Sequence, residues 1–114
     1  SPAAVWQHNR RLSLIDDNGV VLEPVTAATM PDLPLLIGPG ANQRSRELAA
    51  LLEDSRSLKP LLAGATWVGN RRWDLRFDTG ETLSLPEGER AAKTALARFT
   101  HMEGSNRLLG RGII

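Results

Sequence analysis

The spacing of apolar and polar residues changes along the chain, and its first part predicts short strands. Residues Ala4–Gln7, Leu12–Leu14 and Val20–Leu22 form short or alternating apolar runs, and Asp16–Gly19 separates the second run from the third. An Asn-Gly pair between two such runs strongly indicates a β-hairpin. The sequence therefore predicts a hairpin that turns at residues 16–19, followed by an irregular connector over residues 26–34.

A helical period begins at Asn42, after a short apolar run at Leu35–Ile37 and a glycine-rich turn at Gly38–Gly40. Because proline disfavours helical backbone at the residue before it, Pro60 predicts that this helix ends near Ser55–Ser57. The apolar face is predicted to hold three leucines, Leu48, Leu51 and Leu52. The face toward water is predicted to hold Arg44, Arg46, Glu47 and Glu53.

The second half of the chain predicts more strands and a second helix. Leu61–Val68 is β-compatible, and Trp73–Asp78 alternates without a fault, as expected for a strand with one wet face and one dry face. Thr82–Leu85 continues the strand pattern, and a helix follows with a buried face made of Ala91, Ala92, Ala95, Leu96 and Phe99. We expect an α+β fold, an antiparallel curved sheet of hairpins and meanders with two helices packed on it.

Composition narrows the class of protein. With 114 residues the chain is predicted to be a single domain over residues 1–114. A net charge of +1 gives no electrostatic reason to expect nucleic acid or acidic lipid as a partner. Cysteine is absent, which excludes disulfides, thiolate metal sites and cysteine nucleophiles.

The turn Gly38-Pro39-Gly40 raises the question of a phosphate site, because glycine-rich turns before helices cradle phosphates. A dinucleotide-binding turn needs a third glycine where Gln43 stands, and a triphosphate-binding loop ends in Gly-Lys-Ser/Thr. No parallel strand–helix–strand pattern is predicted around the turn. We therefore expect the glycines to permit positive φ and Asn42 to cap the helix.

Other chemistry finds little support in the sequence. His8 and His101 have no second metal ligand at helical spacing, and Asp16-Asp17 is explained by the turn beside it. No nucleophile elbow is present. We expect no catalytic residues, no metal and no cofactor.

Two places are more promising as contacts for a protein partner. Arg71-Arg72 precedes Trp73 at a predicted turn, where arginines suit an acidic protein surface. Ile113-Ile114 at the C-terminus is predicted to begin a strand at the rim of the sheet. Such an edge can accept another chain, either a partner or a second copy, by strand addition.

The chain starts with "PAAVW" (Pro2–Trp6), and "LIDDNGVVLEP" (Leu14–Pro24) follows. These two segments resemble the P-x-A-x-W strand and the first hairpin of the extracytoplasmic β domain of the FtsQ/DivIB cell-division family. "LPLLIGP" resembles the segment that ends in L-x-G-P before the first helix. "RRWDLRFDTGETLSL" resembles its R-x-W hairpin, and "ALARF" resembles the R-L-x-R-F helix.

The resemblance implies a non-enzymatic scaffold that binds the division proteins FtsB and FtsL and helps to assemble and regulate septal peptidoglycan synthesis. It implies contacts at the last strands, at the second helix and at an arginine of the R-x-W hairpin. By position these correspond to Arg71, Arg72, Ile113 and Ile114, whereas Leu96 and Phe99 correspond to the core. Other hypotheses are a ligand- or nucleotide-binding domain that uses Gly38–Gly40, and an outer-membrane assembly or transport module.

The resemblance also implies a longer parent protein. Members of the family carry a short cytoplasmic tail, one inner-membrane helix and a POTRA domain before this periplasmic domain. Further C-terminal strands continue after the position of Ile114. We expect these parts to lie outside the 114 residues, which leaves a sheet edge through which copies of the domain self-associate.

Overall fold

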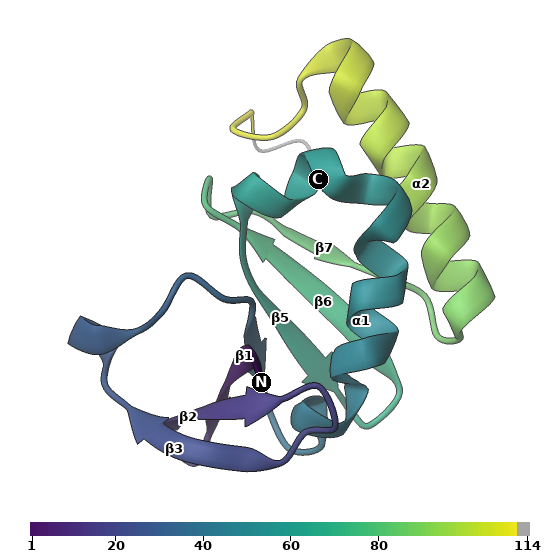
Figure 1. The fold of residues 1–114 in the computed structure, drawn as a ribbon. Coiled ribbons are helices and arrows are strands. Elements are labelled where there is room, and N and C mark those ends of the chain that lie inside the picture. The colour runs from purple at the N-terminus through teal and green to yellow at the C-terminus, as the bar shows by residue number, and fades with distance from the viewer. Residues whose placement is uncertain (112–114) are drawn as a thin grey trace.

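A computed structural model describes residues 1–111 (Figure 1). The chain begins with an antiparallel meander of three strands, β1 (Pro2–His8), β2 (Arg11–Asp16) and β3 (Val21–Val25). The predicted turn at residues 16–19 is confirmed. The Asp16 carboxylate accepts hydrogen bonds from the backbone N–H groups of Asn18 and Val20, both at 2.9 Å. The connector after β3 contains a single 3-10 turn, Ala27–Thr29.

A second antiparallel meander consists of β5 (Leu62–Val68), β6 (Arg72–Phe77) and β7 (Thr82–Ser84). The alternation predicted for β6 is confirmed, because Trp73, Leu75 and Phe77 are buried while the residues between them are not. The helix α2 (Glu89–Asn106) comes next in the chain. Its inner face carries Ala92, Leu96 and Phe99, but Ala91 is exposed and Ala95 is half-buried, so the predicted buried face was too wide.

The short strand β4 (Leu35–Ile37) joins the two meanders into one sheet of seven strands, in the order β3-β2-β1-β4-β5-β6-β7. β4 runs parallel to both β1 and β5. The α+β class with two helices is confirmed, but the sheet is mixed where a wholly antiparallel one was predicted. The reason is that β4 and β5 are linked by a helical crossover rather than by a hairpin, and such crossovers join parallel strands.

The crossover from β4 to β5 contains α1 (Ser45–Leu52), preceded by a 3-10 turn at Ala41–Arg44 and followed by 3-10 turns over Glu53–Leu61. The helix was predicted to end near Ser55–Ser57 because of Pro60, and this prediction was wrong for both the α-helix and the 3-10 turns after it. The α-helix ends at Leu52, and the 3-10 turns continue through Pro60. The break lies at Ser55, whose backbone is not helical. This break allows the buried Ser55 hydroxyl to accept a hydrogen bond from Thr100 Oγ1 of α2 at 2.9 Å.

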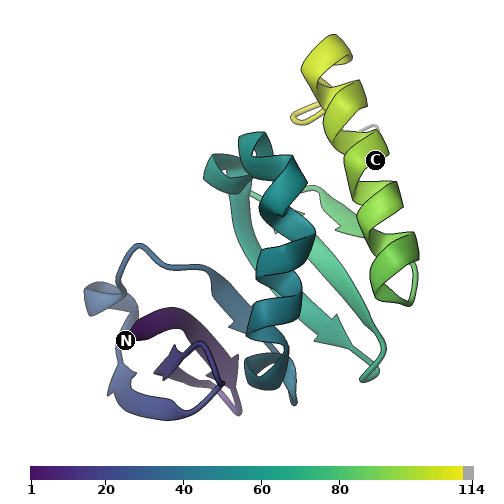
Figure 2. The same ribbon diagram turned by 45° about the vertical axis from the view of Figure 1, so that its right-hand side comes forward.

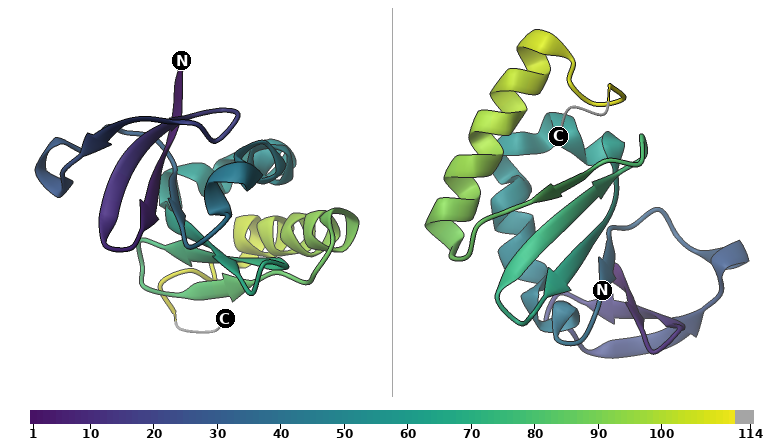
Figure 3. Two further views of the ribbon diagram at one scale, coloured as in Figure 1. Left: turned by 90° about the horizontal axis from the view of Figure 1, so that it is seen from below. Right: turned by 180° about the vertical axis from the view of Figure 1, so that it is seen from behind.

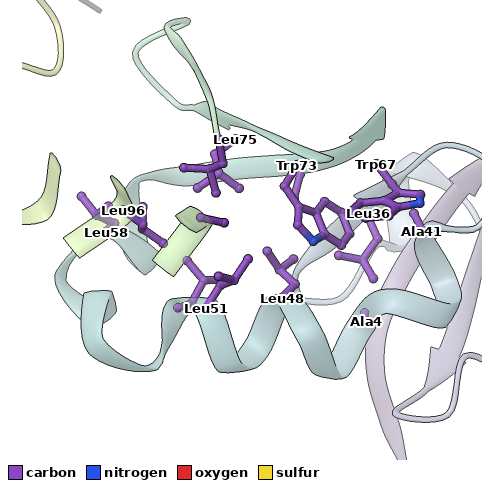
Figure 4. Packing of buried hydrophobic residues seen from close by; sticks show 14 of the residues in the cluster. Ala4, Leu36, Ala41, Leu48, Leu51, Leu58, Trp67, Trp73, Leu75 and Leu96 are labelled. Atoms are coloured by element: carbon purple, nitrogen blue, oxygen red, sulfur yellow. The ribbon is translucent and has the colours of Figure 1, made fainter. Parts of the chain in front are cut away.

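Both helices lie on the same face of the sheet, and the core fills the space between them and the strands. Figure 2 shows α1 and α2 side by side, and the view from behind in Figure 3 shows the strands in front of α1, with α2 beside them. Figure 4 shows Leu48 and Leu51 of α1 directed at Trp73 and Leu75 of the sheet. Leu48, Leu51 and Leu52 are each 3% exposed, as the helical period predicts.

After α2 the chain reverses at Arg107, which has a left-handed backbone with φ 52°. Leu108 and Leu109 then pack against the core. The predicted start of a strand at Ile113 and Ile114 lies outside the described residues.

Candidate partner-binding groove

A groove with a volume of about 250 Å³ opens where the β5–β6 turn meets the first turns of α1 and α2. We call it the hairpin groove. Its lining comes from three segments of the chain, residues 44–51, 67–73 and 86–92, and consists of Arg44, Glu47, Leu51, Trp67, Asn70, Arg71, Arg72, Trp73, Pro86, Glu87, Gly88, Glu89 and Ala92. Both arginines that the sequence singled out, Arg71 and Arg72, are therefore brought to one groove.

The β5–β6 turn that carries these arginines is held in a tight geometry. Gly69 and Asn70 have φ values of 59° and 56°, and the N–H of Arg71 donates to the carbonyl of Val68 at 3.1 Å. Two successive positive φ values are typical of the hairpin turn that matches the twist of the strands. Asn70 Oδ1 also accepts from Trp67 Nε1 at 3.0 Å, so the side chain anchors the turn to the strand.

Two tryptophans from neighbouring strands form the floor of the groove. Trp67 and Trp73 are 7% and 2% exposed, and their ring centroids lie 5.1 Å apart at an angle of 56°. Trp73 Nε1 donates to Glu47 Oε2 of α1 at 3.3 Å, and the Arg44 guanidinium lies 4.8 Å from the centre of the Trp67 ring. Each indole N–H therefore has an acceptor, and each ring is packed against a neighbour.

The charged side chains around the groove differ in whether they already have partners. Arg44 pairs with Glu47 at 3.7 Å, and Arg72 Nε pairs with Asp74 Oδ1 at 3.2 Å. Arg71 is exposed and forms no ion pair with any residue from 1 to 111. Arg71 is therefore the positive charge on this rim that a partner can use without breaking a contact inside the domain.

The structure adds residues to the site that the sequence did not predict. Arg44 and Glu47 were expected to face water, but both are half-buried at the rim of the groove. The sequence indicated part of this arrangement, because Trp67 and Trp73 need hydrogen-bond acceptors for their indole N–H groups when they are buried. Which carboxylate serves Trp73 depends on the position of α1 over the sheet, which local spacing does not encode.

The turn at Gly38–Gly40 is occupied by contacts within the fold. The carbonyl of Gly38 accepts from Trp6 Nε1 at 2.8 Å, and the N–H of Gly38 donates to the carbonyl of Gln7 at 3.0 Å. Gly38 and Gly40 have positive φ, as expected. Two expectations were wrong, because the turn does lie between parallel strands, and Asn42 donates to the carbonyl of Gly19 instead of capping the helix.

The two histidines lie apart from the groove and from each other. His8 stacks on Trp6 with ring centroids 5.0 Å apart, and His101 is exposed on α2. Within residues 1–111 no group of three or more His, Cys, Asp or Glu side chains is arranged to hold a metal ion.

Comparison with known proteins places the chain in a family. The family model described as "Cell division protein FtsQ/DivIB, C-terminal" matches residues 4–113. The chain belongs to the FtsQ/DivIB family. A cell division protein FtsQ of Zymomonas mobilis is 52% identical over 114 residues, which cover 100% of this chain and 36% of that protein. The corresponding protein of Novosphingobium aromaticivorans is 48% identical over 110 residues, 96% of this chain and 34% of that protein.

A solved structure of the FtsQ/DivIB family has the same fold. The major extracytoplasmic domain of the cell division protein DivIB from Geobacillus stearothermophilus matches with a TM-score of 0.58 and 17% identity, covering 93% of this chain and 92% of that one. At this identity the match supports the fold alone. The chain spans about a third of the length of the FtsQ relatives from Zymomonas and Novosphingobium. In the part that the structure describes, neither helix combines the length and the apolar character needed to cross a bilayer.

Proposed function

We propose that this domain is a non-enzymatic scaffold of the cell-division machinery that binds partner proteins at the hairpin groove. The observation that carries the proposal is Arg71, an exposed cation without an ion pair among the described residues, beside a floor of two buried tryptophans. Membership of a family of cell-division proteins supports the same conclusion. The partners we propose are the periplasmic parts of FtsB and FtsL.

The proposed setting is the periplasm, with the parent protein anchored in the inner membrane by one N-terminal helix. There the domain would help to assemble and regulate septal peptidoglycan synthesis. These statements extend beyond the 114 residues, because the relatives are about three times as long. They rest on family membership rather than on the geometry of the groove.

The charge of Arg71 gives the sharpest test. We expect Arg71→Glu to lower the association rate with the periplasmic part of FtsB roughly 3- to 10-fold at low salt, with a smaller effect at high salt, because a rim charge acts mainly on encounter. The measurement is surface-based kinetics on the domain extended through the residues that follow Ile114 in the parent protein.

Arg76→Glu is the matched control for Arg71→Glu. Arg76 is also an exposed arginine of the same hairpin, but it does not line the groove. Equal effects of the two substitutions would show that net charge, not the groove, determines binding. A folded wild-type domain that does not bind FtsB at all would contradict the proposed function itself.

Three further predictions stay open to experiment. Ile113 and Ile114 are proposed to begin the strand that leads to a partner-binding edge, so Ile113→Asp is expected to weaken binding more than Arg111→Asp.

Self-association through a sheet edge predicts a concentration-dependent mass in sedimentation. The alternative use of Gly38–Gly40 as a nucleotide site predicts a rise in melting temperature with nucleotides, and a flat response would exclude it.

A further inference from the structure

The end of α2 contains an acidic side chain in an electrostatically unfavourable place. Glu103 is 8% exposed, lies in the last turn of α2 and forms no ion pair with the residues that the structure describes. A buried carboxylate is costly unless it is well hydrogen-bonded, and a negative charge near a helix C-terminus opposes the helix dipole. Helix formation therefore does not account for a glutamate at this position.

The Glu103 carboxylate holds the segment that leaves the helix. Its Oε1 atom accepts a hydrogen bond from the backbone N–H of Leu109 at 2.7 Å, and its backbone carbonyl accepts from the N–H of Arg107 at 2.9 Å. Charge-assisted hydrogen bonds of this length are about twice as strong as neutral ones. The side chain thus bends back over the helix end and fixes the chain after the reversal at Arg107.

A second carboxylate, from the β6–β7 turn, holds the next residue of the same segment. Glu81 Oε1 accepts from the N–H of Gly110 at 2.6 Å and from Thr79 Oγ1 at 2.7 Å. The N–H of Arg111 donates to the carbonyl of Leu108 at 3.2 Å, which closes a turn over residues 108–111. Two consecutive N–H groups are therefore held by carboxylates from two different elements.

The two contacts also place this segment beside the outer strand. Glu81 immediately precedes β7, which is the last strand of the described sheet. A Cβ atom on Gly110 would lie 3.7 Å from Thr79 Cγ2, so the segment packs directly on the β6–β7 turn. The chain is thereby brought from the far end of α2 to the beginning of the outer strand (Figure 1).

We propose that Glu81 and Glu103 form a carboxylate clasp that positions residues 108–111, the segment leaving α2, at the start of β7. The clasp is distinct from the hairpin groove, which lies at the opposite end of α2 and is lined by its first residues. That the clasp contributes to partner binding rests on the proposed function, because it acts on the segment that leads to Ile113 and Ile114.

Amide hydrogen exchange, resolved by NMR, tests the clasp without any partner. Glu103→Leu removes the acceptor but keeps an apolar volume, and we expect the Leu109 amide to exchange between about 10- and 100-fold faster. Glu81→Ala is expected to do the same to the Gly110 amide. The Arg107 amide is the internal control, because its acceptor is a backbone carbonyl and its exchange is expected to stay unchanged.

A merely structural role makes a different prediction. If Glu103 only supported the core, Glu103→Leu would speed exchange throughout α2 and lower the melting temperature. The clasp predicts a local change with melting held within a few degrees, since the substitution also removes a buried charge. Glu81→Gln and Glu103→Gln keep an acceptor oxygen and are expected to restore most of the protection. Unchanged exchange at Leu109 and Gly110 in Glu103→Leu and Glu81→Ala would overturn the proposal.

A binding measurement on the extended domain completes the test. We expect Glu103→Leu to weaken binding of the FtsB periplasmic part mainly by speeding its dissociation, while Arg71→Glu acts on association. Faster amide exchange with wild-type affinity would overturn the positioning role of the clasp. If the wild-type domain binds no partner, the proposed function fails, but the exchange experiment still decides whether the clasp exists.

Discussion

Gly19 shows how a single residue lets the β2–β3 turn approach the 3-10 turn before α1. It has a φ of 85°, and a Cβ atom at this position would lie 2.5 Å from the backbone oxygen of Asn42 and 2.9 Å from its carbonyl carbon. Both atoms belong to the backbone, so no flexible side chain can move aside. Glycine is therefore required at this position for two reasons, the positive φ and the close approach of the 3-10 turn before α1.

We expect Gly19→Ala to lower the free energy of unfolding by about 3 kcal/mol or more, because strain and a steric clash add. Gly80→Ala is the matched control. Gly80 has a similar φ of 94°, but nothing lies within 4 Å of the added Cβ, so we expect a loss of about 1 to 2 kcal/mol. Urea unfolding of both variants gives the comparison. Equal losses of unfolding free energy in the two variants would show that the steric clash with Asn42 adds nothing to the effect of the positive φ.

At the scale of the element, the outer strand β3 illustrates how a sheet edge is protected. Its outer side has no neighbouring strand among residues 1–111, and Val20, Val21 and Leu22 at its start are 56%, 49% and 45% exposed. An apolar edge of this kind invites pairing with another copy. Pro24 lies in the strand opposite Ser13 and has no N–H to offer to another strand.

We expect Pro24→Val to increase self-association, because it restores a donor and raises β propensity on an exposed edge. Sedimentation velocity across a range of concentrations measures the change. Pro34→Val is the control, since Pro34 is also exposed but stands before the central strand β4. If both variants remain at the wild-type mass, Pro24 does not protect the edge.

Elements that depend on local spacing were predictable from the sequence, and those that depend on distant pairing were not. The alternation at Trp73, Leu75 and Phe77 indicated β6 because the period of a strand is visible within six residues. The parallel pairing of β4 was missed, since three residues carry no period that reveals their partners. The lining of the hairpin groove shows the same division, because Arg71 was singled out from its motif, whereas Glu47 was expected to face water and reaches Trp73 only through the packing of α1.

At the scale of the whole molecule, the first meander is tied to α1 through the β2–β3 turn. Asn42 Nδ2 donates to the carbonyl of Gly19 at 2.9 Å in a partly buried position. Arg46 contacts Asp17 at 3.2 Å and donates to Asn18 Oδ1 at 2.8 Å, but both contacts are exposed. Exposed polar contacts contribute little, so the partly buried Asn42 hydrogen bond is the strongest of the three links.

We expect Asn42→Ala to lower the free energy of unfolding by about 1 to 2 kcal/mol, because it leaves the Gly19 carbonyl without this donor. Gln43→Ala is the control, since Gln43 is exposed and adjacent in sequence, and its effect should stay within about 0.5 kcal/mol. Arg46→Ala is expected to resemble the control. A larger effect of Arg46→Ala than of Asn42→Ala would reverse the assignment of the main link.

The three-residue strand β4 has a consequence for how the molecule opens. Each meander is built from pairings between neighbours in sequence, whereas β4 pairs Val5 with Leu35 and Leu36 with Ala65 across long stretches of chain. Non-local pairings form only after their loop-closure entropy has been met, and proteins open in cooperative units of unequal stability. The domain should therefore behave as two cooperative units with a seam at β4, and a pulling force between its ends would part them there before either unit unravels.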